Sequence, residues 1–318
     1  MDYTKYKLGV IPSPQDTRDY KVSMFYGTPP KQPDFYQIAH LPRIYDQGEV
    51  GQCVAFSLAA IKESHEWLER ISQQRYATSF IYGNRGQFDY QGEGMIPRQA
   101  MARLVQSGVP EWSEMPWVKG YPQCREYVQT NLERLLPLAK PQKIEKYYRI
   151  YNPEEGMTAL INGNAPILYC IAVYPSFYNV DRSTGIVHDV QPYESILGYH
   201  AMVAVGWDTI NGRKYWIVHN SWFTNWGKNG ICLIPFDYKG FDEAWGLTDH
   251  NPTPRKTIVL TIDSKDILIN GFKASMDVAP FIKDNRTFVP VRFVAEAMDM
   301  RVTWDEKNKQ VTIEMPWS

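Results

Sequence analysis

Cys53 begins the apolar half of the segment DQGEVGQCVAFSLAAI, and its surroundings suit a thiol nucleophile. A cysteine reacts as the thiolate, and its ordinary pKa of about 8.5 leaves it mostly protonated at neutral pH. If a helix begins at Cys53, the positive end of the helix dipole lowers that pKa. Gly48 and Gly51 allow a sharp turn before the helix, which leaves the backbone N–H of Cys53 free to donate to an oxyanion. The alternative is a buried structural thiol, because free cysteine is among the most buried residue types.

A thiol nucleophile also needs a base, and His200 is the histidine that best fits this role. It begins the hydrophobic segment GYHAMVAVGWD, where a buried imidazole requires a polar partner. The amide of Asn220 could orient that ring. His219 is adjacent to Asn220, and neighbouring strand residues face opposite ways, so the two cannot both point into one cleft. The other histidines are expected to be solvent-exposed: His40, His65, His188 and His250.

The elements that must position these groups suggest an α+β chain, helical first and strand-rich second. Helices are expected over residues 53–70, 97–107 and 154–162, the last two ended by Gly108 and Gly163. After Pro166, short β-branched and aromatic segments indicate an antiparallel sheet or barrel over residues 166–174, 201–208, 214–222 and 230–236.

The chain also divides into parts of different composition. Residues 1–40 lack helical or strand periodicity and are expected to form an irregular arm on the body. Residues 41–248 form the main domain. Residues 249–257, which contain two prolines, are predicted to be a linker. Residues 258–318 form a small β-rich domain with an Asn-Gly hairpin turn.

Composition narrows the classes of partner. The 318 residues carry 34 Lys+Arg and 35 Asp+Glu, a formal charge of -1, so no basic field favours nucleic acid or an anionic membrane. No apolar run approaches the roughly 20 residues of a membrane span, and the N-terminus lacks the apolar core of a signal peptide. The four cysteines lack paired spacing, so we expect free thiols, no metal site and no cofactor.

Three segments together resemble the papain family of cysteine peptidases: DQGEVGQCVAFS, GYHAMVAVGWD and YWIVHNSWFTNWGKNG. The spacing from Cys53 to His200 falls within the roughly 130–150 residues typical of papain-like enzymes. The resemblance implies a two-lobed fold, with a helical lobe and an antiparallel, barrel-like lobe. It makes Cys53 the nucleophile, His200 its base and Asn220 the orienter of His200, and it makes Gln47 the side-chain donor to the oxyanion.

The same resemblance implies residues around the reacting groups. Trp222 and Trp226 correspond to aromatic residues that shield the Asn–His pair from water. Gly94 matches a glycine that pairs with the substrate backbone, and an apolar substrate pocket is expected from Met95, Ile96 and Ala201.

The chain also departs from the family pattern. Val54 stands where an aromatic residue usually follows the nucleophile, Val50 where a disulfide cysteine is usual, and Phe223 where a glycine is usual. Because 52 residues precede Cys53, we expect no long inhibitory propeptide of the kind that eukaryotic members carry, and the lead-in LGVIPSPQDTRDY is similar to the short one of bacterial members.

The last sixty residues resemble the N-terminal domain of copper amine oxidases, a module of bacterial extracellular proteins. No His follows His250 and no Cys follows Cys232, so nitrogen and sulfur ligands for copper are absent from this segment. We therefore expect a stalk or spacer, with attachment to the cell envelope as one role. This conflicts with the lack of an export signal in the chain as given, so the compartment stays open.

These observations predict a cysteine endopeptidase that acts on peptide or protein substrates. Two alternatives are a thiol amidase or transpeptidase acting on cell-wall peptides, and a catalytically silent module that binds peptides.

Overall fold

The computed structural model describes residues 2–27, 32–70, 74–249, 258–269, 272–298 and 300–314. The chain forms two units, Met1–Pro254 and Arg255–Ser318. In the part that is described, no helix combines the length and the apolar character needed to cross a lipid bilayer.

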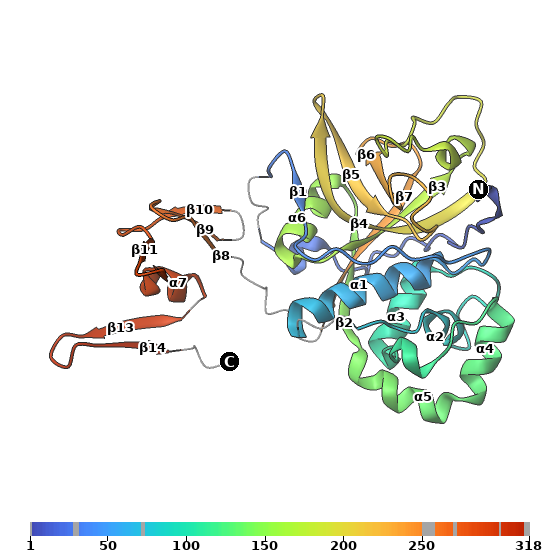
Figure 1. The fold of residues 1–318 in the computed structure, drawn as a ribbon. Helices are drawn as coiled ribbons and strands as arrows, with labels where there is room; N and C mark the ends of the chain where they lie inside the picture. The colour runs from blue at the N-terminus through green and yellow to red at the C-terminus, as the bar shows by residue number, and fades with distance from the viewer. Residues whose placement is uncertain are drawn as a thin grey trace. The chain divides into compact units, whose positions relative to one another are not determined.

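Helix α1 (Cys53–Arg70) is the central element of the first unit, and its predicted bounds are confirmed. Every side chain from Cys53 to Glu66 is buried, because the helix lies between a sheet and a layer of shorter helices (Figure 1). A helix covered on both sides needs no polar face, which explains the continuous apolar run after Cys53.

The helical layer consists of α2 (Thr78–Gly83), α3 (Pro97–Ser107), α4 (Tyr121–Thr130) and α5 (Leu132–Ala139). The prediction for α3 is confirmed at both ends. Pro97 occupies its first turn, and Gly108 follows its last residue with a φ of 70°, a conformation that suits glycine. The sequence analysis did not predict α2, α4 or α5.

An antiparallel sheet forms the other layer, as expected. Its strands are β1 (Tyr36–Gln37), β2 (Ile144–Ile150), β3 (Ile167–Val173), β4 (Gly198–Ile210), β5 (Arg213–His219), β6 (Ile231–Pro235) and β7 (Phe241–Asp249). The order is β2-β7-β3-β4-β5-β6, and β1 pairs with β4. β2 and β7 were not predicted.

Asp249 was placed in the predicted linker, and that placement is wrong. It is the last residue of β7 and is buried, and its carboxylate lies 2.6 Å from the Lys62 ammonium of α1. A buried carboxylate needs such a partner, so Asp249 belongs to the folded unit and not to a linker. Residues 250–257 of the predicted linker, including His250, lie outside the described residues.

The third predicted helix is slightly longer than expected. α6 (Pro153–Gly163) includes Gly163, which was predicted to end it. The helix ends before Asn164, which adopts a left-handed φ of 44°. At the other end, the Asn152 side chain caps the first turn by accepting from the backbone N–H of Glu155.

The N-terminal arm is less irregular than predicted. It contains two short 3₁₀ helices, η1 (Tyr3–Lys5) and η2 (Val22–Met24), and β1 joins the main sheet. Val10 also forms an isolated parallel bridge with Met95. The described part of the arm runs along the boundary between the sheet and the helical layer (Figure 1).

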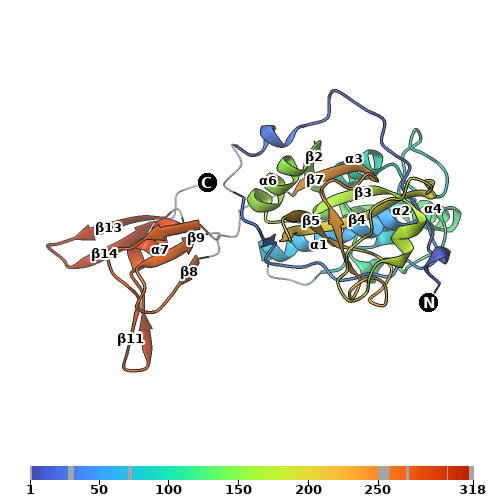
Figure 2. The same ribbon diagram turned by 90° about the horizontal axis from the view of Figure 1, so that it is seen from above.

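The second unit is β-rich, as expected (Figure 2). It contains β8 (Ile258–Leu260), β9 (Asp266–Ile269), β10 (Phe272–Ser275), β11 (Phe281–Lys283), β12 (Arg286–Phe288), α7 (Val291–Ala297), β13 (Arg301–Asp305) and β14 (Gln310–Glu314). β8, β9 and β10 form one sheet, and the other four strands form two hairpins. The predicted Asn-Gly turn at residues 270–271 lies outside the described residues.

Candidate active site

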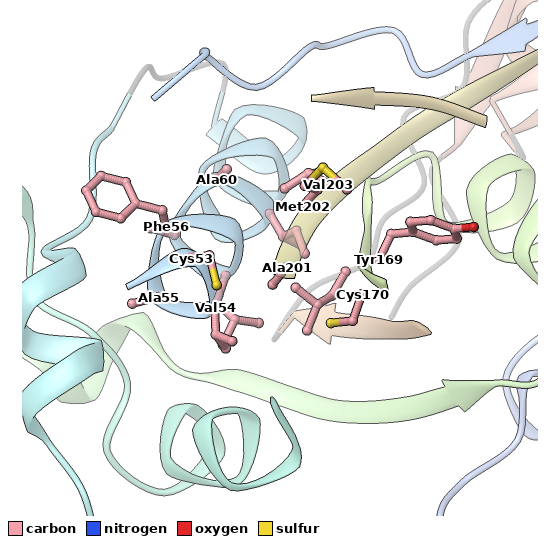
Figure 3. Packing of buried hydrophobic residues seen from close by; sticks show 14 of the residues in the cluster. Cys53, Val54, Ala55, Phe56, Ala60, Tyr169, Cys170, Ala201, Met202 and Val203 are labelled. Carbon is pink, nitrogen blue, oxygen red and sulfur yellow. The ribbon is translucent and has the colours of Figure 1, made fainter. Parts of the chain in front are cut away.

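Cys53 is the first residue of α1 and has no exposed surface. Its sulfur points toward the strand that carries Ala201 (Figure 3). Burial raises the pKa of this thiol to about 11, against the backbone N–H groups of Ala201 and Gly9, which lower the pKa by pointing at the sulfur. In this arrangement Cys53 is therefore a neutral thiol at neutral pH.

His200 and Asn220 are brought together by the pairing of β4 with β5. Nε2 of His200 lies 2.7 Å from Oδ1 of Asn220, and the same oxygen accepts the backbone N–H of Ser221 at 2.8 Å. Because that atom acts as an acceptor, Nε2 of His200 carries the proton and Nδ1 of the neutral ring has a free lone pair. Among the described residues, Nδ1 of His200 has no hydrogen-bond partner. Burial lowers the pKa of His200 to about 4, although the bond to Asn220 opposes this shift.

The backbone of β4 beside His200 lies close to Cys53. The amide N–H that points at the Cys53 sulfur belongs to Ala201, the residue that follows His200 on β4. A buried thiol and a buried, oriented imidazole thus belong to adjoining parts of the fold, as a cysteine nucleophile and its base would require.

The remaining histidines do not join this site. Nδ1 of His219 lies 3.1 Å from the Pro42 carbonyl, so the His219 ring contacts a different segment from the one that the Asn220 amide contacts. His65 was expected to be exposed, and this is wrong: it is buried, because α1 is covered on both sides, and burial lowers its pKa to about 4. His40 is half-buried against Trp67, whereas His188 is exposed as expected.

Gln47 is connected to the Asn–His pair through Ser221. Oε1 of Gln47 accepts the Ser221 hydroxyl at 2.7 Å. Its Nε2 donates to the Val50 carbonyl at 2.8 Å and to the Lys7 carbonyl at 3.0 Å. Both amide hydrogens are therefore engaged, and one of them is held by a residue of the N-terminal arm.

Ser221 was missed by the sequence analysis, although the hydroxyl beside Asn220 was a signal for it. It connects the two polar groups of the site, because its N–H binds Asn220 and its hydroxyl binds Gln47. It is buried, so these two bonds are not exchanged with water.

Aromatic rings cover His200. The ring centroid of Trp222 lies 4.7 Å from that of His200, and Trp226 lies 5.4 Å from Trp222. Phe177, which the sequence analysis did not single out, packs on both tryptophans and lies 6.5 Å from His200. All three rings are buried, and an apolar cover of this kind strengthens the His–Asn hydrogen bond.

The residues predicted to contact substrate lie on two segments of the first unit, residues 94–96 and strand β4. Gly94 has a φ of 90°, and its backbone N–H donates to the Tyr82 hydroxyl at 2.8 Å. Met95 is buried, and Ile96 is half-buried just before α3. Ala201 is fully buried, on β4 opposite Cys170 of β3. Their part in a substrate pocket stays a prediction.

The described residues were also compared with the requirements of a metal site. Within the described ranges, no group of three or more His, Cys, Asp or Glu side chains could hold a metal ion. All four cysteines are buried free thiols.

The first unit thus combines a helical layer and an antiparallel sheet with a buried cysteine at the start of the central helix and a hydrogen-bonded His200–Asn220 pair. Residues 29–243 match the family model described as papain family cysteine protease, and residues 252–313 match that of the copper amine oxidase N-terminal domain. Because the first match covers more than half of the chain, the chain belongs to the papain family of cysteine proteases.

Similar proteins agree with this membership. A cysteine protease of Blomia tropicalis is 26% identical over 219 residues, which are 66% of this chain and 62% of that protein. A cathepsin L-like proteinase of Fasciola hepatica is 29% identical over 212 residues, 64% of this chain and 60% of that protein. The chain thus spans about three fifths of these relatives' length.

Solved structures show the same fold. Xylellain, a cysteine protease from Xylella fastidiosa, aligns with a TM-score of 0.66 at 23% identity, over 78% of this chain and 97% of that one. The bromelain protease from Ananas comosus, solved in complex with the E64 inhibitor, aligns with a TM-score of 0.53 at 19% identity, over 69% of this chain and 100% of that one. The fold of the first unit is papain-like.

Proposed function

We propose that the chain is a cysteine endopeptidase in which Cys53, His200, Asn220 and Gln47 carry out the chemistry. The observation that supports this most directly is the 2.7 Å contact between Nε2 of His200 and Oδ1 of Asn220, which leaves Nδ1 of His200 free to act as the base for Cys53.

The reaction begins when Nδ1 of His200 takes the proton of the Cys53 thiol. The thiolate then attacks the carbonyl carbon of the scissile peptide bond, and the carbonyl oxygen becomes an oxyanion. The backbone N–H of Cys53 and the side-chain N–H of Gln47 stabilise that oxyanion, and loss of one such donor typically costs about 10²–10³ in rate. His200 then gives its proton to the leaving amine, and the C–N bond breaks to leave a thioester.

Water completes the cycle. His200 removes a proton from a water molecule, whose oxygen attacks the thioester carbonyl, and Cys53 leaves as the thiolate. Asn220 keeps the imidazole in the tautomer and orientation that both halves of the reaction require.

A cysteine exchange tests this proposal. We expect Cys53→Ser to lose at least about 10³-fold in the hydrolysis of casein and fluorogenic peptides, because a serine hydroxyl is not activated by this pair. The matched control is Cys124→Ser, since the Cys124 thiol is also buried but has other partners: it donates to the Val118 carbonyl at 3.2 Å and accepts from Nε2 of Gln52 at 3.6 Å. Unchanged hydrolysis by Cys53→Ser would rule out the assignment.

A silent peptide-binding module makes a different prediction. It would bind peptides equally well in the wild type and in Cys53→Ser, and neither protein would turn them over. A profile of cleaved sequences from a peptide library would then define the substrate preference.

A further inference from the structure

A cavity in the first unit has no part in the chemistry proposed above. Its volume is about 110 Å³, and it lies between the first turn of α6 and the strands β2, β3, β5 and β7. We propose that this cavity is a second binding site, which takes a single aromatic ring that carries a hydroxyl group. The proposal goes beyond the peptidase function and does not depend on it.

The cavity lies on the face of β3 that is turned away from Cys53. Burial, then the charge of Glu243 and then that of Cys53 raise the pKa of Cys170, so the Cys170 thiol is on the Cys53 side of the strand. Successive side chains of a strand point to opposite faces, so Tyr169 faces the cavity instead. Figure 3 shows the Tyr169 ring extending away from Cys53. A ligand in the cavity would therefore leave the proposed peptide cleft free.

Aromatic rings form one continuous wall of the cavity. Phe236 stacks on Trp216, with ring centroids 4.2 Å apart. The Tyr169 ring lies 6.1 Å from that of Trp216 and 5.5 Å from that of Phe241. Aromatic rings attract one another in offset or edge-on arrangements, beyond the effect of the area that they bury. This wall therefore favours an aromatic ring over an aliphatic chain.

The cavity exists because Ala244 is small. In the register of the sheet, Ala244 of β7 lies between Tyr169 of β3 and Ile150 of β2, so one methyl group separates two large side chains. Tyr151 and Phe241 also line the cavity and are 43% and 38% exposed, so a ligand can enter beside them. An apolar cavity of about 150 Å³ in another protein holds benzene, so the space here suits one ring.

Two polar groups in the walls point to a ligand oxygen. Tyr169 is 2% exposed and Trp216 is 3% exposed. Among the described residues, neither the Tyr169 hydroxyl nor the Trp216 indole N–H has a hydrogen-bond partner, although buried polar groups normally have one. Burial raises the pKa of Tyr169, so its hydroxyl keeps the proton and can donate. A phenolic oxygen can accept from these donors, whereas benzene would leave both unpaired.

Titrations with phenol and with benzene test the proposal. The protein is the full chain carrying Cys53→Ser, which prevents self-digestion, and binding is followed by saturation-transfer NMR. We expect phenol to bind saturably with a Kd of about 1 mM or tighter, since very small ligands bind strongly for each atom. Benzene should bind about tenfold more weakly, because it makes no hydrogen bond. A Kd for phenol weaker than about 10 mM would overturn the proposal.

Removal of the Tyr169 hydroxyl tests the hydrogen bond. In Tyr169→Phe we expect the affinity for phenol to fall about five- to tenfold, while the affinity for benzene stays the same. The matched control is Tyr238→Phe, because the Tyr238 hydroxyl is also buried without a partner among the described residues but does not line the cavity. Unchanged affinity for phenol in Tyr169→Phe would contradict a hydrogen-bonded site.

A larger side chain at Ala244 tests the location. Ala244→Leu fills the cavity and should weaken phenol binding at least about tenfold. If this variant does not fold, Ala244→Val places a smaller, β-branched side chain that suits a strand, and it should weaken binding in the same direction. Wild-type affinity for phenol in a folded Ala244 variant would show that phenol binds elsewhere and would overturn the proposal.

The ring could reach the cavity as a free small molecule or as the tyrosine side chain of another protein. N-acetyltyrosinamide separates these sources: binding as tight as that of phenol indicates a side chain, and much weaker binding indicates a free molecule. The two proposals also fail separately. Phenol binding without any peptide hydrolysis by the wild type would support this site and refute the peptidase, whereas hydrolysis without phenol binding would do the reverse.

Discussion

Oδ1 of Asn220 is shared between two donors, the ring of His200 and the backbone N–H of Ser221. This sharing fixes the orientation of the amide, because an amide rotated by 180° would bring its NH₂ group against the N–H of Ser221. The tautomer of His200 is therefore set by the hydrogen bond from the backbone N–H of Ser221 to the neighbouring Asn220 side chain.

Ser221 is expected to act through Gln47. In Ser221→Ala, Oε1 of Gln47 loses its hydroxyl donor inside a buried site, and the Gln47 amide is less well held toward the oxyanion. We predict a fall in kcat on the order of tenfold, with KM little changed, measured on a fluorogenic peptide. In a Gln47→Ala background, Ser221→Ala should have no further effect, whereas additive losses would show that Ser221 acts independently of Gln47.

The carboxyl of Asp242 should make the free energy of unfolding depend on pH. Burial, and then the charge of Glu243, raise the pKa of its carboxyl to about 6, and its buried Oδ2 has no hydrogen-bond partner among the described residues. As the pH rises from 3.8 toward 6 the unfolded state loses this proton first, so ionisation destabilises the folded state, and the full penalty is present above pH 6.

Asp242→Asn removes that ionisation. We expect its Tm to exceed that of the parent by roughly 2 °C or more at pH 7.5, with the difference shrinking as the pH falls toward 4. Calorimetry across this range, in a Cys53→Ser background that prevents self-digestion, measures the effect. The control is Glu126→Gln, at an exposed position of α4, which should show no such trend.

The residues proposed to react could be selected from the sequence, whereas the groups that hold them could not. Cys53, His200 and Asn220 are marked by residue type and by position on a helix or strand. Ser221 and the Lys7 carbonyl act through contacts between segments far apart in the sequence, which no local periodicity reports. His65 was mispredicted because its charged neighbours suggested an exposed helix face.

At the scale of elements, the charged residues near His65 distinguish the second half of α1. Lys62 is almost fully buried, and its ammonium contacts Glu66 on the same helix and Asp249 at the end of β7. The helix is thus fastened to the sheet by a buried ionic cluster in its second half and by apolar packing around Cys53 in its first. The sequence analysis missed this because charge in a helix normally indicates a solvated face.

Lys62→Ala should therefore be strongly destabilising. Its removal leaves two carboxylates buried beside each other, and breaking a buried ion pair in this way costs about 3–5 kcal/mol. Urea unfolding in the Cys53→Ser background measures the free energy of unfolding. The control is Lys146→Ala, because the side chains of Lys146 and Glu145 are 49% and 41% exposed, and it should change stability by less than about 1 kcal/mol.

Among the other elements, strong local signals were the ones that could be predicted. α3 has a proline at its start and a glycine after its end, and β3 is a continuous apolar run. β2 and β7 lack such signals. β2 contains exposed Glu145 and Lys146 as well as buried Ile150, and β7 contains a glycine, Gly246. Their pairing with each other, rather than their propensity, stabilises them.

At the scale of the whole molecule, the two units have cores of very different size. The continuous apolar core of the first unit extends in sequence from Tyr3 to Leu247. In the second unit the described buried apolar side chains are Ile267, Met276, Ala295 and Ala297. A module of about sixty residues with so small a core is only marginally stable by itself.

This contrast leads to a prediction for a chain that ends at Pro254. All of β7 is retained, including the contact of Asp249 with Lys62, so the sheet and the proposed active site stay complete. We expect the shortened chain, carrying Cys53→Ser, to keep the Tm of the main transition of the full-length Cys53→Ser protein to within about 2 °C. The same truncation of the active chain should leave kcat/KM on a small peptide unchanged.

Calorimetry of the full-length chain should then show a second, smaller transition at lower temperature that is missing from the shortened chain, because independent units unfold separately. A single cooperative transition in the full-length chain, or a large loss of Tm on truncation, would mean that residues 255–318 stabilise the peptidase unit. Their role would then be structural support and not that of the stalk or spacer expected from the sequence.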